Sequence, residues 1–133
     1  MSQAFEKFKP LAPLFLRFGL GMIFLYHGVT KIFAEGTSLG FSWSRSGLPT
    51  VIQALVAWGE FLGGIACLTG FMTEIASCGI IVIMIGAILT VHGKNGFNMM
   101  NRGFEYNFAL IIMALTLIAL GPGNIRIGGK GKK

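Results

Sequence analysis

Residues 51–92 read VIQALVAWGEFLGGIACLTGFMTEIASCGIIVIMIGAILTVH. They contain two apolar runs, about 51–70 and 75–92, which are joined by residues 71–74 alone. As helices with a rise of about 1.5 Å per residue, both runs approach the thickness of a bilayer core, roughly 30 Å. A joint this short holds consecutive helices side by side in opposite directions. The segment therefore predicts an antiparallel hairpin of two transmembrane helices.

Two more apolar runs flank this hairpin, at about 14–33 and 105–120. Neither run alternates apolar and polar residues with a period of two, so membrane strands are not expected. The predicted fold is an all-α membrane protein, an antiparallel bundle of four transmembrane helices that forms a single domain over residues 1–133. A basic tail, 124–133, follows the last helix.

The composition excludes an ordinary soluble chain and a disordered one. Of the 133 residues, 53% are hydrophobic and only 12% are charged, and the mean hydropathy is +0.71. A soluble domain has about 25% charged residues, so this chain cannot cover a water-facing surface. A disordered chain lacks the apolar surface that is in excess here. We expect the surplus to face lipid.

The net charge of +6 indicates membrane flanks rather than a nucleic-acid partner. No basic helix and no interleaving of basic with aromatic residues is present, so nucleic-acid binding is not expected. With four spans, both termini share one side of the membrane. That side carries seven of the 11 lysines and arginines: Lys7, Lys9, Arg17, Arg126, Lys130, Lys132 and Lys133. The positive-inside rule therefore places both termini in the cytoplasm.

Five ionisable residues toward the outer ends of the predicted helices form the candidate proton or ligand site: His27, Lys31, Glu60, His92 and Glu105. Such groups are costly within a membrane and mark functional sites by default. Counted along the helices, Glu60 lies about 14 Å and His27 about 9 Å below the outer surface. His27 and Lys31 are four residues apart and share a helix face. These depths predict a polar pocket that opens outward, with Glu60 at its floor.

Two interpretations of Glu60 stay open. In one, Glu60 binds a ligand or carries a proton. In the other, it forms a structural ion pair with Lys31 that locks the first helix to the second. Small residues around Glu60 would then let the helices pack closely: Gly59, Gly63, Gly64 and Ala66. In both cases Gln53, Glu60 and Cys67, which recur every seven residues, are expected to form one stripe that faces the bundle.

The other polar and aromatic residues are assigned structural roles. Arg17 is expected to reach lipid headgroups at the inner surface. Cys67 and Cys78 are expected to be small buried thiols. The aromatic residues are expected to be interfacial anchors or packing residues: Tyr26, Trp43, Trp58 and Tyr106. No catalytic motif and no metal-ligand spacing is present, so no catalytic residue and no metal site is assigned, and whether the protein is an enzyme stays open.

Several short motifs, spread over about residues 14–127, resemble the DoxX family of small four-helix membrane proteins. They are His27-Gly28-x-x-Lys31, Glu60 followed by Gly63-Gly64, His92, Gly96-Phe97, Glu105-Tyr106 and Gly121-Pro122-Gly123. The resemblance implies a multi-pass protein of the bacterial or archaeal plasma (inner) membrane. Members of the family are linked to oxidoreductase systems, including thiosulfate:quinone oxidoreduction and a membrane redox complex that acts against oxidative stress.

Residues and resemblance together predict an accessory or quinone-interacting subunit of a membrane oxidoreductase system. His27 would donate to a quinone carbonyl, and Glu60 would accept or deliver a proton. The chain shows no redox centre of its own, so the expected partners are membrane lipids, a redox protein that supplies electrons, and further copies of the chain in a homo-oligomer. The alternatives are a non-catalytic scaffold or assembly factor and a small transporter, although the polar route toward the cytoplasm ends below Glu60.

Overall fold

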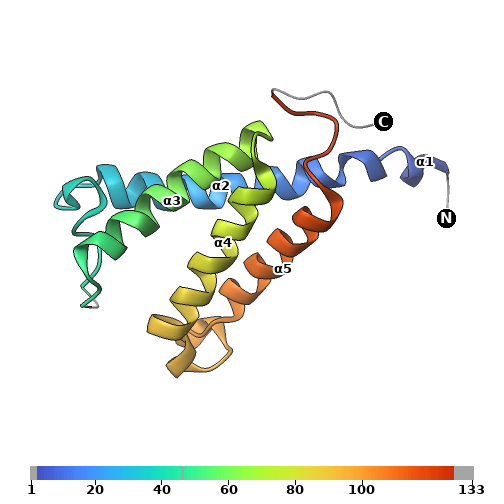
Figure 1. Ribbon diagram of the computed structural model, residues 1–133. Helices are drawn as coiled ribbons and strands as arrows, with labels where there is room; N and C mark the ends of the chain where they lie inside the picture. The colour runs from blue at the N-terminus through green and yellow to red at the C-terminus, as the bar shows by residue number, and fades with distance from the viewer. Residues whose placement is uncertain (1–2, 46, 128–133) are drawn as a thin grey trace.

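Four long helices form two antiparallel hairpins (Figure 1). The computed structural model describes residues 3–45 and 47–127, and this part of the chain contains helices and no strand. The paired helices are α2 (Ala12–Phe33) with α3 (Thr50–Thr69), and α4 (Thr73–Ala87) with α5 (Glu105–Leu120). Shorter pieces are α1 (Gln3–Glu6), a π-helical turn (Ile88–His92) and 3-10 turns at Lys9–Leu11, Ser38–Gly40, Gly93–Asn95 and Met99–Asn101. The predicted all-helical membrane bundle is confirmed.

The helix ends follow from local sequence signals, and they fall close to the predicted ends. Pro13 occupies the first turn of α2, where its missing N–H costs nothing. α3 ends at Thr69, and the following Gly70 donates its N–H to the Ala66 carbonyl at 2.9 Å and turns the chain away with a left-handed backbone (φ 76°). Pro122 prevents α5 from continuing. The third predicted helix is longer than α4 because its last five residues form the π-helical turn Ile88–His92.

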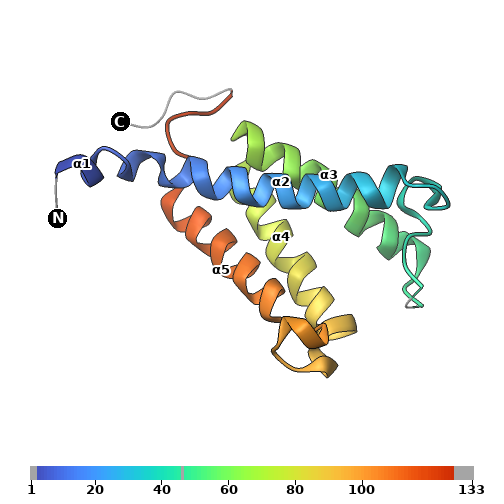
Figure 2. The same ribbon diagram turned by 180° about the vertical axis from the view of Figure 1, so that it is seen from behind.

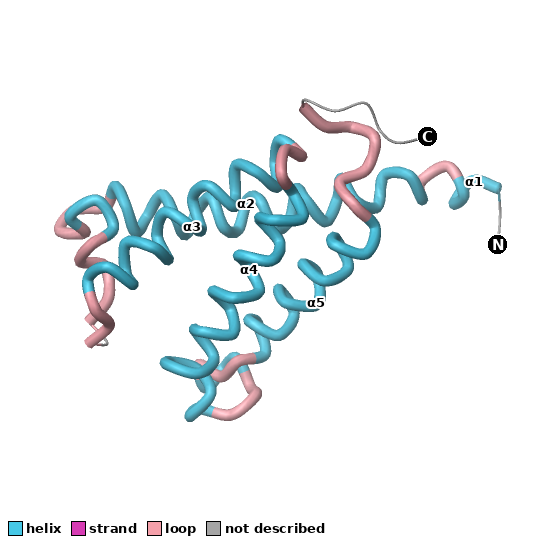
Figure 3. Tube along the Cα trace, in the orientation of Figure 1, coloured by secondary structure: helices cyan, strands magenta, loops and turns pink. Residues whose placement is uncertain are grey.

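The two hairpins meet at one end of the molecule and diverge toward the other (Figures 1 and 2). We call the end that holds the turn 70–72 and the segment after α5 the convergent end. We call the end formed by the connections 34–49 and 93–104 the open end. Figure 3 shows that these two connections lie at the tips of different hairpins. The antiparallel bundle is therefore open on one side.

Glycines bring the backbones of α2 and α3 into contact. A Cβ added to Gly28 would lie 2.4 Å from the Phe61 nitrogen, and one added to Gly64 would lie 2.5 Å from the Leu25 nitrogen. No side chain fits at either position without separating the helices, which is the close packing that small residues permit in membranes. Of the small residues predicted around Glu60, Gly64 thus serves this contact.

Side chains from all four helices form the core. The buried core residues are Leu20 and Phe24 of α2, Cys67 of α3, Ile80 and Met84 of α4, and Leu110, Ala114 and Leu117 of α5. On α3, Gln53, Glu60 and Cys67 are all buried, at 5%, 3% and 0% exposure, which confirms the predicted inward stripe. Cys78 is exposed on α4, so the prediction that it is buried was wrong. Its helix is covered on fewer sides than α2 and α3.

Length and composition suit a membrane location. Within the described residues, three helical segments are long and apolar enough to cross a bilayer: Lys9–Phe33, Thr50–Thr69 and Thr73–Asn95. α5 is apolar but shorter, and its 16 residues reach about 24 Å. Of the predicted basic tail, residues 128–133, which include all three of its lysines, lie outside the described residues.

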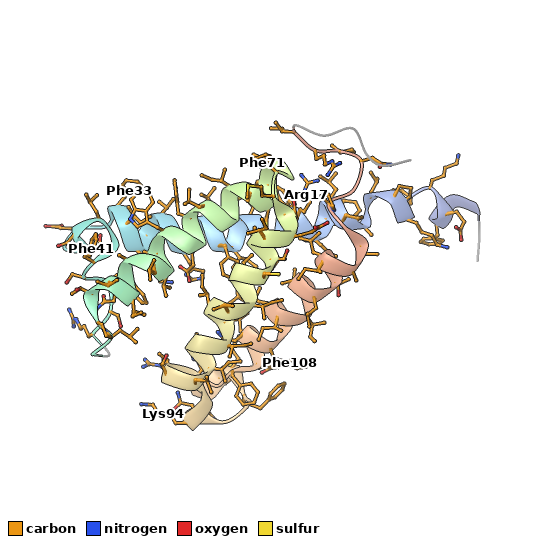
Figure 4. The ribbon with its side chains drawn as sticks, viewed as in Figure 1. Arg17, Phe33, Phe41, Phe71, Lys94 and Phe108 are labelled. Carbon is orange, nitrogen blue, oxygen red and sulfur yellow. The ribbon has the colours of Figure 1, made fainter. Side chains whose placement is uncertain are left out.

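Arg17 lies inside the convergent end, beside the segment that follows α5 (Figure 4), and the prediction that it reaches lipid headgroups was wrong. Its Nε donates to the Cys67 carbonyl at 2.8 Å and its Nη2 to the Leu68 carbonyl at 3.0 Å. Its Nη1 donates to the carbonyls of Pro122 at 2.8 Å and Ile125 at 2.5 Å. The last carbonyls of a helix have no partner within the helix, and one guanidinium offers five N–H donors. Arg17 therefore ties the end of α3 to the segment after α5.

Candidate functional site

A cavity of about 880 Å³ lies between the two hairpins. All four long helices and the connections 34–49 and 93–104 contribute to its wall, which is mostly apolar. Its lining includes the buried residues Phe24, Glu60, Met84 and Leu110, whereas Arg17 and the residues it bonds at the convergent end do not line it. The cavity is thus closed toward the convergent end and accessible from the open end.

An ion pair between Lys31 and Glu60 joins α2 and α3 at this cavity, which Arg45 and Arg102 of the two connections also line. The Lys31 ammonium on α2 donates to the Glu60 carboxylate on α3. The Glu60 side chain is 4% exposed and the Lys31 side chain 19% exposed, so Lys31 is the partner that faces the cavity more fully. The Lys31 ammonium also lies 4.7 Å from the centre of the Trp43 ring, a distance at which the ring face attracts a cation.

Gln53 holds the connection 34–49 in place over this pair. Its side-chain oxygen accepts from the Ser44 N–H at 2.8 Å, and its side-chain nitrogen donates to the Leu48 carbonyl at 2.9 Å. The Trp43 indole N–H donates to the backbone carbonyl of Gln53 at 2.7 Å. The connection is therefore folded back onto α3, and Trp43 is positioned beside Lys31.

The α4–α5 hairpin supplies the opposite wall. His92, at the end of the π-helical turn, lines the cavity, and its Nδ1 lies 2.8 Å from the Arg102 carbonyl oxygen. π-helical turns occur often at functional sites. Tyr106 and the buried Asn107 line the same wall, and the Asn107 amide nitrogen donates to the Met84 sulfur at 3.3 Å. Polar groups thus lie on both hairpins.

The structure brings four of the five predicted site residues to the cavity, and it joins two of them directly. Lys31 and Glu60 are bonded to each other, whereas His92 lines the opposite wall. His27 lines the cavity as well, but it is exposed, and its ring lies edge-on to Tyr26 at 5.5 Å. Glu105 does not line the cavity. Its carboxylate accepts from the Met99 N–H at 3.0 Å and closes the connection 93–104.

Sequence reasoning missed Gln53, Trp43 and Asn107 as residues of this site. The seven-residue stripe through Glu60 carried a signal for Gln53, because it placed a second large polar side chain on the inward face of α3. Nothing in the sequence indicated that Trp43 would reach Lys31, since a connection of this length folds in many ways. Within the described residues, no group of three or more His, Cys, Asp or Glu side chains could hold a metal ion.

Comparison with known proteins identifies the family. The model of the DoxX family matches residues 12–93, from the start of α2 to just past the π-helical turn. The chain belongs to the DoxX family. "Putative oxidoreductase CatD" of Bacillus subtilis (strain 168) is 36% identical over 128 residues, which cover 92% of this chain and 90% of that protein. No solved structure matches the chain at significant similarity. Family membership and three apolar helices of spanning length together make this a multi-pass membrane protein.

The matched segment 12–93 contains α2, α3 and α4. It therefore includes the ion pair of Lys31 with Glu60, and also His27 and His92. α5 and Glu105 lie beyond it. The DoxX segment thus supplies all four predicted site residues that line the cavity.

Proposed function

We propose that this DoxX-family protein is an accessory subunit of a membrane oxidoreductase system and that its cavity binds the head group of a membrane quinone. The observation that carries the proposal is the buried ion pair of Lys31 with Glu60 on the wall of an apolar cavity of about 880 Å³. The name of the Bacillus relative, "Putative oxidoreductase CatD", supports the redox part of the proposal.

The cavity suits a ligand with a small polar head and an apolar body. Ligand sites typically enclose about 300–1,000 Å³ and combine apolar walls with a few polar groups, and this cavity fits both criteria. A lysine ammonium has three donors, of which one is directed to Glu60, so Lys31 can also donate to a carbonyl. His27, one turn earlier on the same face of α2, lies within the same cavity.

The chain's own residues would position the head group and handle protons. A bound quinone supplies the redox centre, since its reduction takes up two electrons and two protons. Glu60 orients the Lys31 ammonium and is the group placed to accept or deliver a proton. Trp43, held by Gln53, covers the pair and limits the access of water. Electrons come from a partner redox protein.

We further propose that the protein lies in the plasma (inner) membrane with its convergent end and both termini on the cytoplasmic side. Over the full sequence, seven lysines and arginines fall on the side of the termini and four on the side of the open end, which supports this orientation under the positive-inside rule. A reporter enzyme fused after residue 133 tests it. Reporter activity on the cytoplasmic side is expected, and reporter activity on the outer side would show the opposite orientation.

Purification in mild detergent, followed by mass spectrometry of bound lipids and proteins, tests the function. Wild-type protein should retain a quinone and a redox protein in stoichiometric amounts, and Glu60→Gln should retain less quinone. Glu74→Gln, an exposed glutamate at the convergent end, is the matched control and should behave as the wild type. Retention of ordinary phospholipid alone by the wild type would contradict quinone binding and favour a scaffold.

A further inference from the structure

The wall of the cavity is incomplete between α3 and α4. Near their middle, α3 and α4 are in contact. A Cβ added to Gly63 of α3 would lie 4.0 Å from Ile80 of α4, and one added to Gly59 would lie 3.2 Å from Ile83. Toward the open end α3 and α4 diverge (Figure 1). The next turns of both helices therefore border a gap.

The side chains at this gap belong both to the cavity and to the outer surface. Leu55 of α3 and Val82 of α4 line the cavity, yet they are 64% and 70% exposed. Gly86, one turn beyond Val82, also lines the cavity, and a Cβ added there would meet no atom within 4 Å. The absence of a side chain at Gly86 thus leaves the gap open.

The gap lies at the level of the hydrocarbon core. Gly86 precedes Asn95, the end of the candidate span Thr73–Asn95, by nine residues, which corresponds to about 14 Å along a helix. This depth is near the middle of a bilayer core of roughly 30 Å. A molecule that enters through the gap therefore arrives from lipid and not from water.

We infer that the gap bordered by Leu55, Val82 and Gly86 is a lateral portal, through which an amphiphile dissolved in the bilayer enters the cavity and brings its polar head to Lys31 and Glu60. Gly86 is the residue that sets the width of the portal. The identity of the amphiphile rests on the proposed function, whereas the route rests on the geometry of α3 and α4. Apolar side chains of α3 and α4 line the cavity next to the gap, among them Ile52, Val56 and Ile83, so an apolar body can remain between the helices while the head is bound.

A nitroxide label inside the cavity reports the route without any ligand. The label is attached at Val56→Cys, a cavity position of α3, in a Cys78→Ala background in lipid nanodiscs, while the fully buried Cys67 is left in place. Collisions of the label with oxygen, which concentrates in hydrocarbon, are compared with collisions with a water-soluble nickel chelate. Gly86→Phe should fill the portal, and Gly86→Val provides a smaller filling variant.

Gly79→Phe is the matched control. A Cβ at Gly79 also meets no atom within 4 Å, and Gly79 lies on the same helix but does not line the cavity. Oxygen collisions should exceed nickel collisions at position 56, should fall in Gly86→Phe and less in Gly86→Val, and should be unchanged in Gly79→Phe. Dominant nickel collisions that neither Gly86 variant alters would overturn the portal.

The experiment can contradict the portal and the proposed function independently of each other. Loading of Gly86→Phe with a long-tailed quinone at the wild-type rate would overturn the portal and leave quinone binding in place. The opposite result is also possible. If Gly86→Phe blocks the access of oxygen to position 56 but the wild type retains no quinone, the portal is supported and quinone binding is contradicted.

Discussion

Lys31 on α2 and Glu60 on α3 form an ion pair that joins the two helices of the first hairpin and faces the cavity. The structural role and the ligand role of Glu60 are therefore compatible, because one pair of side chains can serve both. Burial is uneven, with Glu60 almost fully enclosed and Lys31 partly open to the cavity. This asymmetry leaves the lysine free to meet a ligand while the glutamate holds it.

Removal of one partner of this pair should destabilise the protein more than removal of both. Lys31→Met leaves the Glu60 charge buried without compensation, which costs about 3–5 kcal/mol in comparable pairs. The double variant Lys31→Met with Glu60→Gln removes both charges and should recover part of this loss. Free energies of unfolding from SDS titration in mixed micelles measure the difference. Strict additivity of the two single changes would show that the pair is not coupled.

Arg17→Met should loosen the convergent end. The change leaves the carbonyls of Cys67, Leu68, Pro122 and Ile125 without their donor, and hydrogen bonds to a charged group are worth about 1.5–3 kcal/mol each. Thermal unfolding can be followed with a fluorogenic thiol reagent that reacts with Cys67 as it becomes exposed, in a Cys78→Ala background.

Arg17→Lys is the control for charge. One ammonium cannot span the carbonyls that the guanidinium fork reaches, so this variant should melt between the wild type and Arg17→Met. If Arg17→Met melts at the wild-type temperature, the hydrogen bonds at the convergent end do not stabilise the fold.

Gly28→Ala should separate α2 from α3. The added methyl group would lie 2.4 Å from the Phe61 nitrogen, and overpacking of this kind costs about 1–3 kcal/mol. Gly79→Ala is the matched change at a glycine with open space, where a better helix former can add about 1 kcal/mol of stability. Thermal unfolding should thus move in opposite directions for the two variants. Equal effects would contradict the backbone contact of α2 with α3.

Gln53→Leu should release the connection 34–49. Both side-chain bonds, to Ser44 and Leu48, are lost, and Trp43 should become more accessible. Quenching of Trp43 fluorescence by acrylamide, in a Trp58→Phe background, measures this accessibility. Gln53→Glu keeps the acceptor for Ser44 but loses the donor to Leu48, so its quenching should be intermediate. Unchanged quenching in Gln53→Leu would mean that other contacts hold the connection.

The sequence predicted the helices because they depend on periodicity and length, and it offered the ion pair of Lys31 with Glu60 as one of two interpretations of Glu60. Apolar runs of spanning length, with a short joint between the second and third, determine an antiparallel order. Depth counted from the helix ends then placed Glu60 about 5 Å below His27, within reach of the polar groups of the neighbouring helix. Depth along a helix does not tell which way a side chain points around the helix axis. The depth of Glu105 therefore could not show that its carboxylate closes the connection 93–104 and lies away from the cavity.

Other features could not be predicted because their partners are backbone atoms. The bonds of Arg17 and Gln53 reach carbonyls and an N–H group, which every residue carries, so no sequence pattern identifies them. The contact at Gly28 depends on where the backbone of α3 passes, and the divergence of the hairpins depends on the packing of the whole convergent end. These features required the three-dimensional structure.

The central claim, that Lys31 and Glu60 bind a quinone head group, is tested most directly by titration of a quinone into nanodiscs. Trp43, which lies 4.7 Å from the Lys31 ammonium, reports occupancy through fluorescence quenching in a Trp58→Phe background. Lys31→Met is compared with Lys94→Met, a lysine at the open end that does not line the cavity (Figure 4). Saturable quenching is expected for the wild type and for Lys94→Met. For Lys31→Met we expect roughly tenfold weaker binding, which corresponds to the loss of one charged hydrogen bond. Equal affinity in Lys31→Met, or quenching in the wild type that does not saturate, would contradict the claim.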